Sequence, residues 1–150
     1  MTIILALDTV TDACSAAIWR DGTTTATVLA AIFDDGNYVL AIEEFTSFIM
    51  RFESSKLTLR AKFLRGESNL RIENWSLAAE DFLDTFSSQP SGPLSPYALF
   101  GLVLSLSELG EIEQSCATLF EIKRRHPEKF NQFKDQLKVS KKSLNCNEYD

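Results

Sequence analysis

The sequence predicts an all-α fold, in which three helical hairpins stack as a solenoid, a capping helix follows them and a short β-hairpin precedes them. Two observations predict this arrangement. A nine-residue pattern recurs three times at one fixed step, and short turn segments separate stretches of helical periodicity. Repeat periods of about 20 to 50 residues are typical of arrays in which each unit buries its apolar face against the next.

The repeat is seen in residues 37–45, 74–82 and 111–119, so that the step from 37 to 74 and from 74 to 111 is 37 residues both times. Three columns keep their character: Tyr38, Trp75 and Ile112; Ala41, Ala78 and Ser115; Phe45, Phe82 and Leu119. The columns are spaced i, i+3 and i+7, which puts them on one face of a helix. The small middle residue is expected where a neighbouring helix comes close.

Each copy has a partner helix before it. We expect helices at 26–35, 38–52, 57–71, 75–87, 95–109, 112–125 and about 128–143. The turns inside the hairpins fall at 34–36, 72–73 and 109–110, where Gly36 and Gly110 suit the left-handed conformation that ends a helix.

Both ends of the array differ from the repeats. Residues 3–9 and 14–22 are typical of two strands, so a β-hairpin segment is expected over 1–25, the repeat domain over 26–144 and a tail over 145–150. The last repeat of a solenoid needs a cover for its apolar face. Four apolar residues of the last segment suit that role: Phe130, Phe133, Leu137 and Leu144.

Composition narrows the class of protein. The chain has 150 residues, of which 45% are hydrophobic and 24% charged, as in an ordinary folded domain. It lacks an apolar run of spanning length and an export signal at its start, so we expect no membrane insertion and a cytoplasmic location. From Lys123 onward the balance turns basic, which we interpret as a solvated helix face; an anionic partner is the alternative, and nucleic acid is not expected.

The residues that could carry chemistry are few. Cys14, Cys116 and Cys146 form no CxxC pair, so neither a zinc site nor a disulfide framework is expected, and we interpret Cys14 and Cys116 as buried small apolar residues. His126 is the one histidine of the chain and is expected to cap a helix end.

The acidic pairs at 43–44 and 80–81 are interpreted as solvated faces. Because a catalytic site needs a nucleophile with a base, a metal cluster or paired carboxylates in a cleft, we expect no enzyme activity, no cofactor and no metal.

A binding surface is expected instead on the concave side, which the first helix of each hairpin lines in such arrays. The predicted partner-binding residues are Phe33, Arg60, Phe63, Glu67, Leu70, Arg71, Tyr97, Phe100, Leu104 and Glu108. Aromatic and arginine side chains carry much of the energy of protein interfaces. The alternative for Phe63 and Phe100 is that they pack between hairpins.

The repeat resembles the tetratricopeptide pattern, which Gly66, Ala41, Ala78, Pro90 and Pro127 fit and from which Val103 departs, because it stands at a glycine position. Segments 36–45, 61–67 and 116–119 resemble the C-terminal tetratricopeptide domain of the Tol-Pal-associated CpoB (YbgF) family, over about residues 27–143.

This resemblance implies a periplasmic adaptor that binds the TolA protein. It also implies a role in coordinating outer-membrane constriction with peptidoglycan synthesis during cell division. The sequence does not fix the oligomeric state.

The first 22 residues resemble a different family. Segments 3–9 and 14–22 are similar to the opening hairpin of the TsaB family, whose members are non-catalytic subunits in the synthesis of threonylcarbamoyladenosine in tRNA. That resemblance implies the alternative function, a tRNA-modification subunit. A cytoplasmic helical-repeat adaptor with an unrelated partner is the other alternative.

Overall fold

A computed structural model describes residues 35–139 and 144–146 of the chain, and the regular secondary structure in them is helical. Its helices are α3 (Tyr38–Arg51), α4 (Thr58–Arg71), α5 (Trp75–Ser88), α6 (Ser95–Leu109), α7 (Ile112–Arg125) and α8 (Pro127–Val139). No strand occurs in these residues, so the prediction of an all-α fold is confirmed for them.

The predicted helix boundaries are accurate to one residue for the five helices from α3 to α7. The predicted final helix, 128–143, begins one residue earlier, at Pro127, and residues 140–143 lie outside the described part. The β-hairpin expected over 1–25 and most of the helix expected over 26–35 also lie outside it, as do Phe33 and Cys14.

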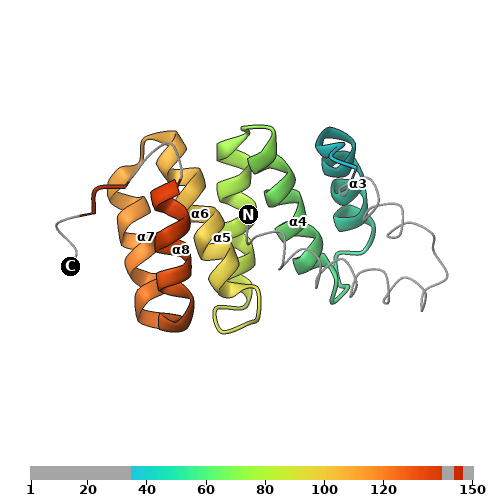
Figure 1. The fold of residues 1–150 in the computed structure, drawn as a ribbon. Helices are drawn as coiled ribbons and strands as arrows, with labels where there is room; N and C mark the ends of the chain where they lie inside the picture. The colour runs from blue at the N-terminus through green and yellow to red at the C-terminus, as the bar shows by residue number, and fades with distance from the viewer. Residues whose placement is uncertain (1–34, 140–143, 147–150) are drawn as a thin grey trace.

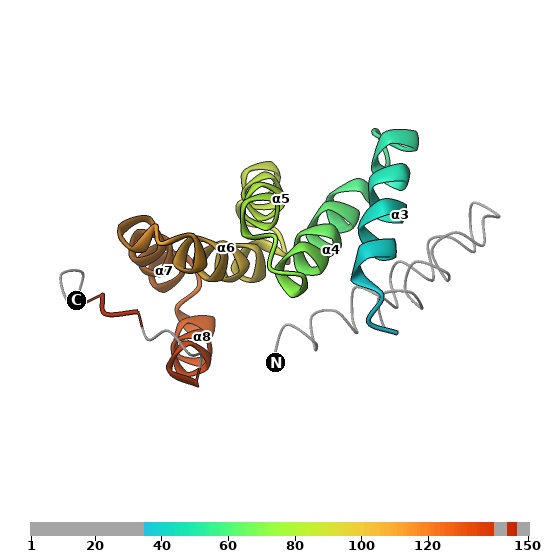
Figure 2. The same ribbon diagram turned by 90° about the horizontal axis from the view of Figure 1, so that it is seen from above.

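The helices form a row in which each packs against the next along the chain (Figure 1). In addition, α4 contacts α6 directly, although α5 separates them in sequence. Figure 2 shows α8 outside this row, on the side of α6 and α7 away from α5. α4 and α6, the first helices of the second and third hairpins, lie on one side of the row, and α8 lies against its end.

The backbone repeats with the sequence. Gly36 and Gly110 take positive φ values of 77° and 83°, as the turn segments predicted. Glu73, which stands at the equivalent position of the turn without glycine, takes a φ of 63°. Three turns at a step of 37 residues thus adopt one left-handed conformation, the form in which helices commonly end.

The predicted small-residue column is fully buried, with Ala41, Ala78 and Ser115 at 0% exposure. Ser115 also donates a hydrogen bond from Oγ to the carbonyl of Val103, at 2.8 Å. The column of Phe45, Phe82 and Leu119 is buried as well. The remaining column differs, since Tyr38 and Trp75 are half-buried but Ile112 is 43% exposed.

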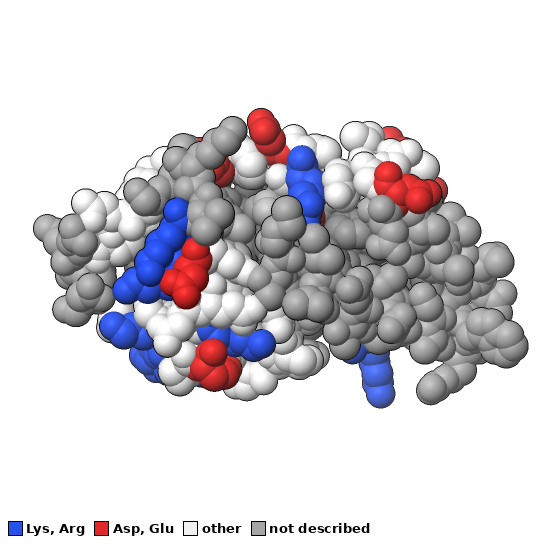
Figure 3. Space-filling view, viewed as in Figure 1, with Lys and Arg blue, Asp and Glu red and all other residues white. Residues whose placement is uncertain are grey.

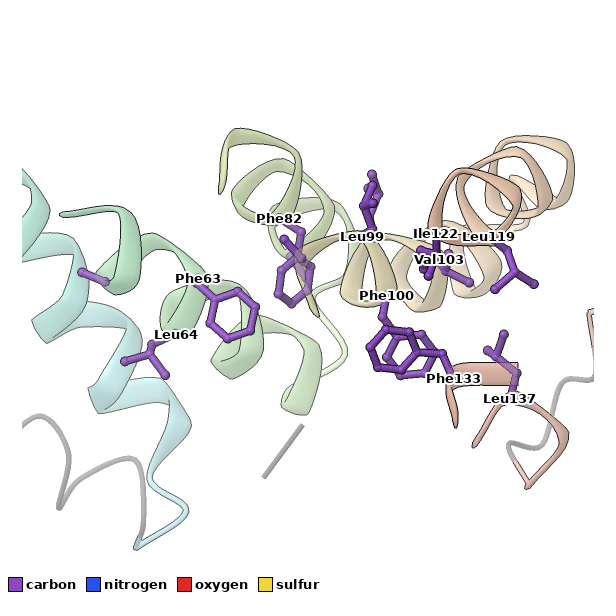
Figure 4. Packing of buried hydrophobic residues seen from close by; sticks show 14 of the residues in the cluster. Phe63, Leu64, Phe82, Leu99, Phe100, Val103, Leu119, Ile122, Phe133 and Leu137 are labelled. Atoms are coloured by element: carbon purple, nitrogen blue, oxygen red, sulfur yellow. The ribbon is translucent and has the colours of Figure 1, made fainter. Parts of the chain in front are cut away.

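Phe82 is wedged between glycines of two neighbouring helices. A Cβ atom added to Gly101 of α6 would lie 2.5 Å from the Phe82 ring, and one added to Gly66 of α4 would lie 3.2 Å from it. Phe63 meets the same ring edge-on, with 5.7 Å between centroids. The Phe82 side chain of α5 thus fills the space between α4 and α6 (Figure 4).

The capping role predicted for the last helix is confirmed. Phe133 and Leu137 are buried, and Phe130 and Leu144 pack against the same core. The Phe133 ring stacks on Phe100 of α6, with 4.4 Å between centroids and an interplanar angle of 8° (Figure 4).

Cys116 is buried as predicted, but the expectation of no disulfide is wrong, because Cys116 forms a disulfide with Cys146 across a sequence separation of 30 residues. Their Cα atoms are 5.5 Å apart. The pair has no sequence signature because α8 and the tail bring it together only in the folded chain. The bond closes a loop that contains α8 and fastens the cap.

Replacing Gly101 with alanine is expected to lower the free energy of unfolding by about 1 to 3 kcal/mol, the usual cost of overfilling a packed core. A loss of stability would be informative, because replacing glycine with alanine in an exposed helix instead stabilises it by about 1 kcal/mol. Urea denaturation measures the change. Gly66→Ala is the matched control and should cost less, since its closest contacts are longer; equal stability of Gly101→Ala and wild type would contradict the wedge.

Replacing Cys146 with serine is expected to lower the free energy of unfolding by about 3 to 4 kcal/mol, as the loop-closure relation gives for a loop of this size. Urea denaturation with and without a reductant measures it, and the reductant should have no further effect on the variant. Cys14→Ser serves as the control because Cys14 is not a member of the pair. A variant as stable as the oxidised wild type would contradict the stapling role.

Candidate partner-binding face

The predicted partner-binding residues fall into three groups in the structure. Three are buried: Phe63, Glu67 and Phe100; four are half-buried: Arg60, Leu70, Tyr97 and Leu104; two are exposed: Arg71 and Glu108. Phe33 lies outside the described residues. For Phe63 and Phe100 the packing alternative applies, because both rings belong to the core.

The α6 half of this face is covered by the cap of the chain itself. Phe133 stacks on Phe100 and meets Tyr97 edge-on at 5.9 Å between centroids. The Lys129 ammonium lies 5.4 Å from the centroid of the Tyr97 ring. A partner on this side can therefore reach α6 only beside α8, which leaves α4 as the part of the face to consider.

On α4, the side chains of the face that are not buried are Arg60, Leu70 and Arg71, of which two are basic. Arg60 is half-buried and Arg71 exposed, and the Arg71 guanidinium lies 5.9 Å from the centre of the Tyr38 ring of α3. Arginine is enriched among the residues that contribute most of the binding energy in protein interfaces.

Glu67 is a buried acid on the same helix. Its side chain is fully buried, and neither carboxyl oxygen has a hydrogen-bond partner among the described residues. Burial raises the pKa of Glu67 from 4.5 to about 8, and the nearby Arg71 offsets part of that rise. The carboxyl is therefore largely protonated at neutral pH.

The pH dependence of stability follows from Glu67. The folded chain holds this proton more tightly than the unfolded chain, so the contribution of Glu67 to stability falls as the pH rises from about 4.5 to about 8. Glu67→Gln is expected to match wild type near pH 5 and to exceed it at pH 8, by at most about 5 kcal/mol. Urea denaturation across this range measures it, with exposed Glu113→Gln as control. Parallel profiles of wild type and Glu67→Gln would contradict the raised pKa.

An ion pair that the sequence did not reveal, together with one further hydrogen bond, links three helices. Arg65 of α4 donates two hydrogen bonds to Asp81 of α5, at 2.7 and 2.9 Å, and a third to Thr46 of α3 at 3.1 Å. Burial raises the pKa of Asp81 although Arg65 opposes it, and the bond to Asp81 raises the pKa of Arg65.

The solvated-face interpretation of residues 80–81 is therefore wrong for Asp81, although Glu80 is exposed. A signal existed: Ala78, Asp81, Phe82 and Thr85 are spaced three, four and seven residues apart, and all four are buried.

Ser95 and His126 are in contact, with 2.9 Å between Oγ and Nε2. The hydroxyl of Ser95 donates its proton to the carbonyl of Pro90 at 2.7 Å, so its oxygen accepts from Nε2. A nucleophilic serine needs the opposite direction, with its proton on the histidine. The pair links the first residue of α6 to the residue that ends α7, where the sequence predicted a capping role for His126.

Basic side chains gather at the end of the molecule formed by α7 and α8, and acidic ones lie among them (Figure 3). Several contact rings: Lys134 lies 5.7 Å and Lys123 5.6 Å from the centroid of Phe130. Arg124 and Arg125 both bond to Glu121, which lowers the pKa of that carboxyl to about 2. Basic charge therefore remains in excess at this end of the molecule, as the sequence from Lys123 onward indicates.

Within the described residues, no three His, Cys, Asp or Glu side chains lie close enough together to hold a metal ion. None of the helices in this part has both the length and the apolar character that crossing a bilayer requires. No protein family and no curated protein matches the chain in sequence.

Proposed function

We propose that this chain is a non-catalytic protein-interaction module built from tetratricopeptide-like hairpins. The observation that carries the proposal is the repetition at a step of 37 residues. Left-handed turns at Gly36, Glu73 and Gly110 and a buried column of small residues both recur at this step. Stacked hairpins of this kind present an extended side to a partner. The direct contact between α4 and α6 supports such a continuous side.

The partner we propose is a TolA-like envelope protein, and the role is that of an adaptor in cell-envelope constriction during division. The resemblance of segments 36–45, 61–67 and 116–119 to the CpoB family motivates this choice. On α4, Arg60 and Arg71 are the side chains expected to meet the partner, because the aromatic residues of the face are packed in the core.

The same proposal puts the chain in the periplasm, in place of the cytoplasmic location expected from its start. What supports this compartment is the disulfide between Cys116 and Cys146. Disulfides persist in oxidising compartments and are rare in the reducing cytosol.

Calorimetric titration of the oxidised chain with a periplasmic TolA fragment tests the proposal. We expect saturable binding that the charge reversals Arg60→Glu and Arg71→Glu together weaken at least about tenfold, as loss of interface arginines does. Arg124→Glu makes the same kind of change on α7, at the other end of the row, and should leave the affinity unchanged. Absence of binding would refute the proposed partner face. So would a loss of affinity in Arg124→Glu equal to that of the double variant.

A further inference from the structure

The α6 part of the predicted partner face is occupied by a helix of the chain itself. The Phe133 ring of α8 stacks on Phe100 at 4.4 Å and meets Tyr97 edge-on at 5.9 Å between centroids. Figure 4 shows the two phenylalanine rings facing each other between α6 and α8. Partner proteins often bind in this way, by setting the apolar side chains of one helix face into an apolar surface. The place of α8 is therefore one that a partner helix can take.

Few side chains hold α8 in this place. Among its side chains that the structure describes, only Phe133 and Leu137 are buried and Phe130 is half-buried, whereas most residues of α6 are buried. Figure 2 shows α8 apart from the row that the other helices form. Because a helix of this length is stabilised mainly by the apolar face it packs against its neighbours, α8 depends on these few contacts.

Gln136 weakens the docked position further. Its Oε1 is buried and has no hydrogen-bond partner among the described residues. A buried acceptor without a partner lowers stability, because water would bond to it in a helix that is not docked. Docked α8 thus carries an unfavourable contribution that a released α8 would not.

The disulfide between Cys116 and Cys146 supplies the rest of the attachment. It joins the segment after α8 to α7, and at the other end only His126 separates α7 from α8. Both ends of α8 are therefore fastened, and without the bond one end is. Cys116 is 3% exposed whereas Cys146 is half-buried, so the sulfur of Cys146 is the more accessible to an external thiol.

We propose that the strip of α6 around Tyr97 and Phe100 is a second docking site, which the disulfide keeps closed. Its occupant is an amphipathic helix of a partner protein, with aromatic and leucine side chains at the spacing that Phe130, Phe133 and Leu137 have on α8. The inference rests on the proposed function only in that the occupant is a protein. The site lies on α6, apart from the α4 residues assigned above to the TolA-like partner.

A reductant protein with a vicinal dithiol opens the site. Its thiolate attacks Cys146 Sγ, the bond to Cys116 Sγ breaks, and Cys116 leaves as a thiolate that takes up a proton. The second thiol of the reductant then attacks the mixed disulfide, so that Cys146 leaves as a thiol and the reductant becomes a disulfide. Two electrons and two protons pass to the cysteine pair, and α8 is then held at one end only.

Hydrogen exchange of the full chain, followed by mass spectrometry with and without dithiothreitol, tests the release of α8. In the reduced chain we expect the amides of α8 to be at least about tenfold less protected than those of α5, as for a cap that opens while the row stays folded. The oxidised chain should show a smaller difference. Equal protection of α8 and α5 in the reduced chain, or the same difference in both chains, would overturn the proposal.

A fluorescent peptide with the sequence of residues 127–139 is the probe for the docking site itself. Its anisotropy should show at least about tenfold tighter binding to the reduced chain than to the oxidised one, because α8 competes best when both its ends are fastened. The Cys146→Ser chain should bind it as the reduced chain does, without a reductant. If that variant does not fold, the reduced wild type gives the same comparison.

The matched control is the same peptide with Phe133→Ala, which lacks the stacking ring and should bind the reduced chain several-fold more weakly. Equal binding of the two peptides, or equal binding of the first peptide to both chains, would refute the site. The TolA titration uses the oxidised chain and variants of α4, so its failure counts against the proposed partner alone, and failure of the peptide titration counts against this site alone.

Discussion

The close approach of helices at small residues is the constraint on which the rest of the structure depends. Phe82 occupies space that exists only because Gly66 and Gly101 lack a Cβ, and the ring thereby connects α4, α5 and α6. Ala41, Ala78 and Ser115 allow the same close approach at each repeat step. Since packed interiors tolerate little added volume, these positions fix the spacing of the row and so the surfaces on both sides of it.

Polar interactions then add specificity to this apolar frame. Arg65 can bond to α3 and α5 at once only because the small residues hold those helices close to α4, and the pair is largely shielded from water. A buried ion pair is weak evidence for stability but is well suited to fixing one arrangement. The disulfide acts similarly at the other end, where it holds α8 against the aromatic residues of α6.

Periodic features could be predicted from the sequence, and contacts between distant segments could not. The 37-residue step located α3 to α7 and the buried columns. This was possible because residues three, four and seven positions apart in the sequence lie on the same face of a helix. The bond between Cys116 and Cys146, the tie between Arg65 and Asp81, and the burial of Phe63 and Phe100 depend on which helix lies opposite. The sequence therefore predicted the candidate face as a set of positions, but it did not predict which of them a partner can reach.

Helix α4 is where unsatisfied groups concentrate. Among the described residues, the buried side-chain oxygens without a hydrogen-bond partner belong to Glu67, Asn69 and Gln136, and the first two lie on α4. On α6, which occupies the equivalent place in the next hairpin, Leu104 and Leu106 stand 37 residues after Glu67 and Asn69. A helix that carries unpaired buried groups loses stability that its equivalent keeps. Two otherwise matched helices thus differ in the stability that their buried side chains contribute.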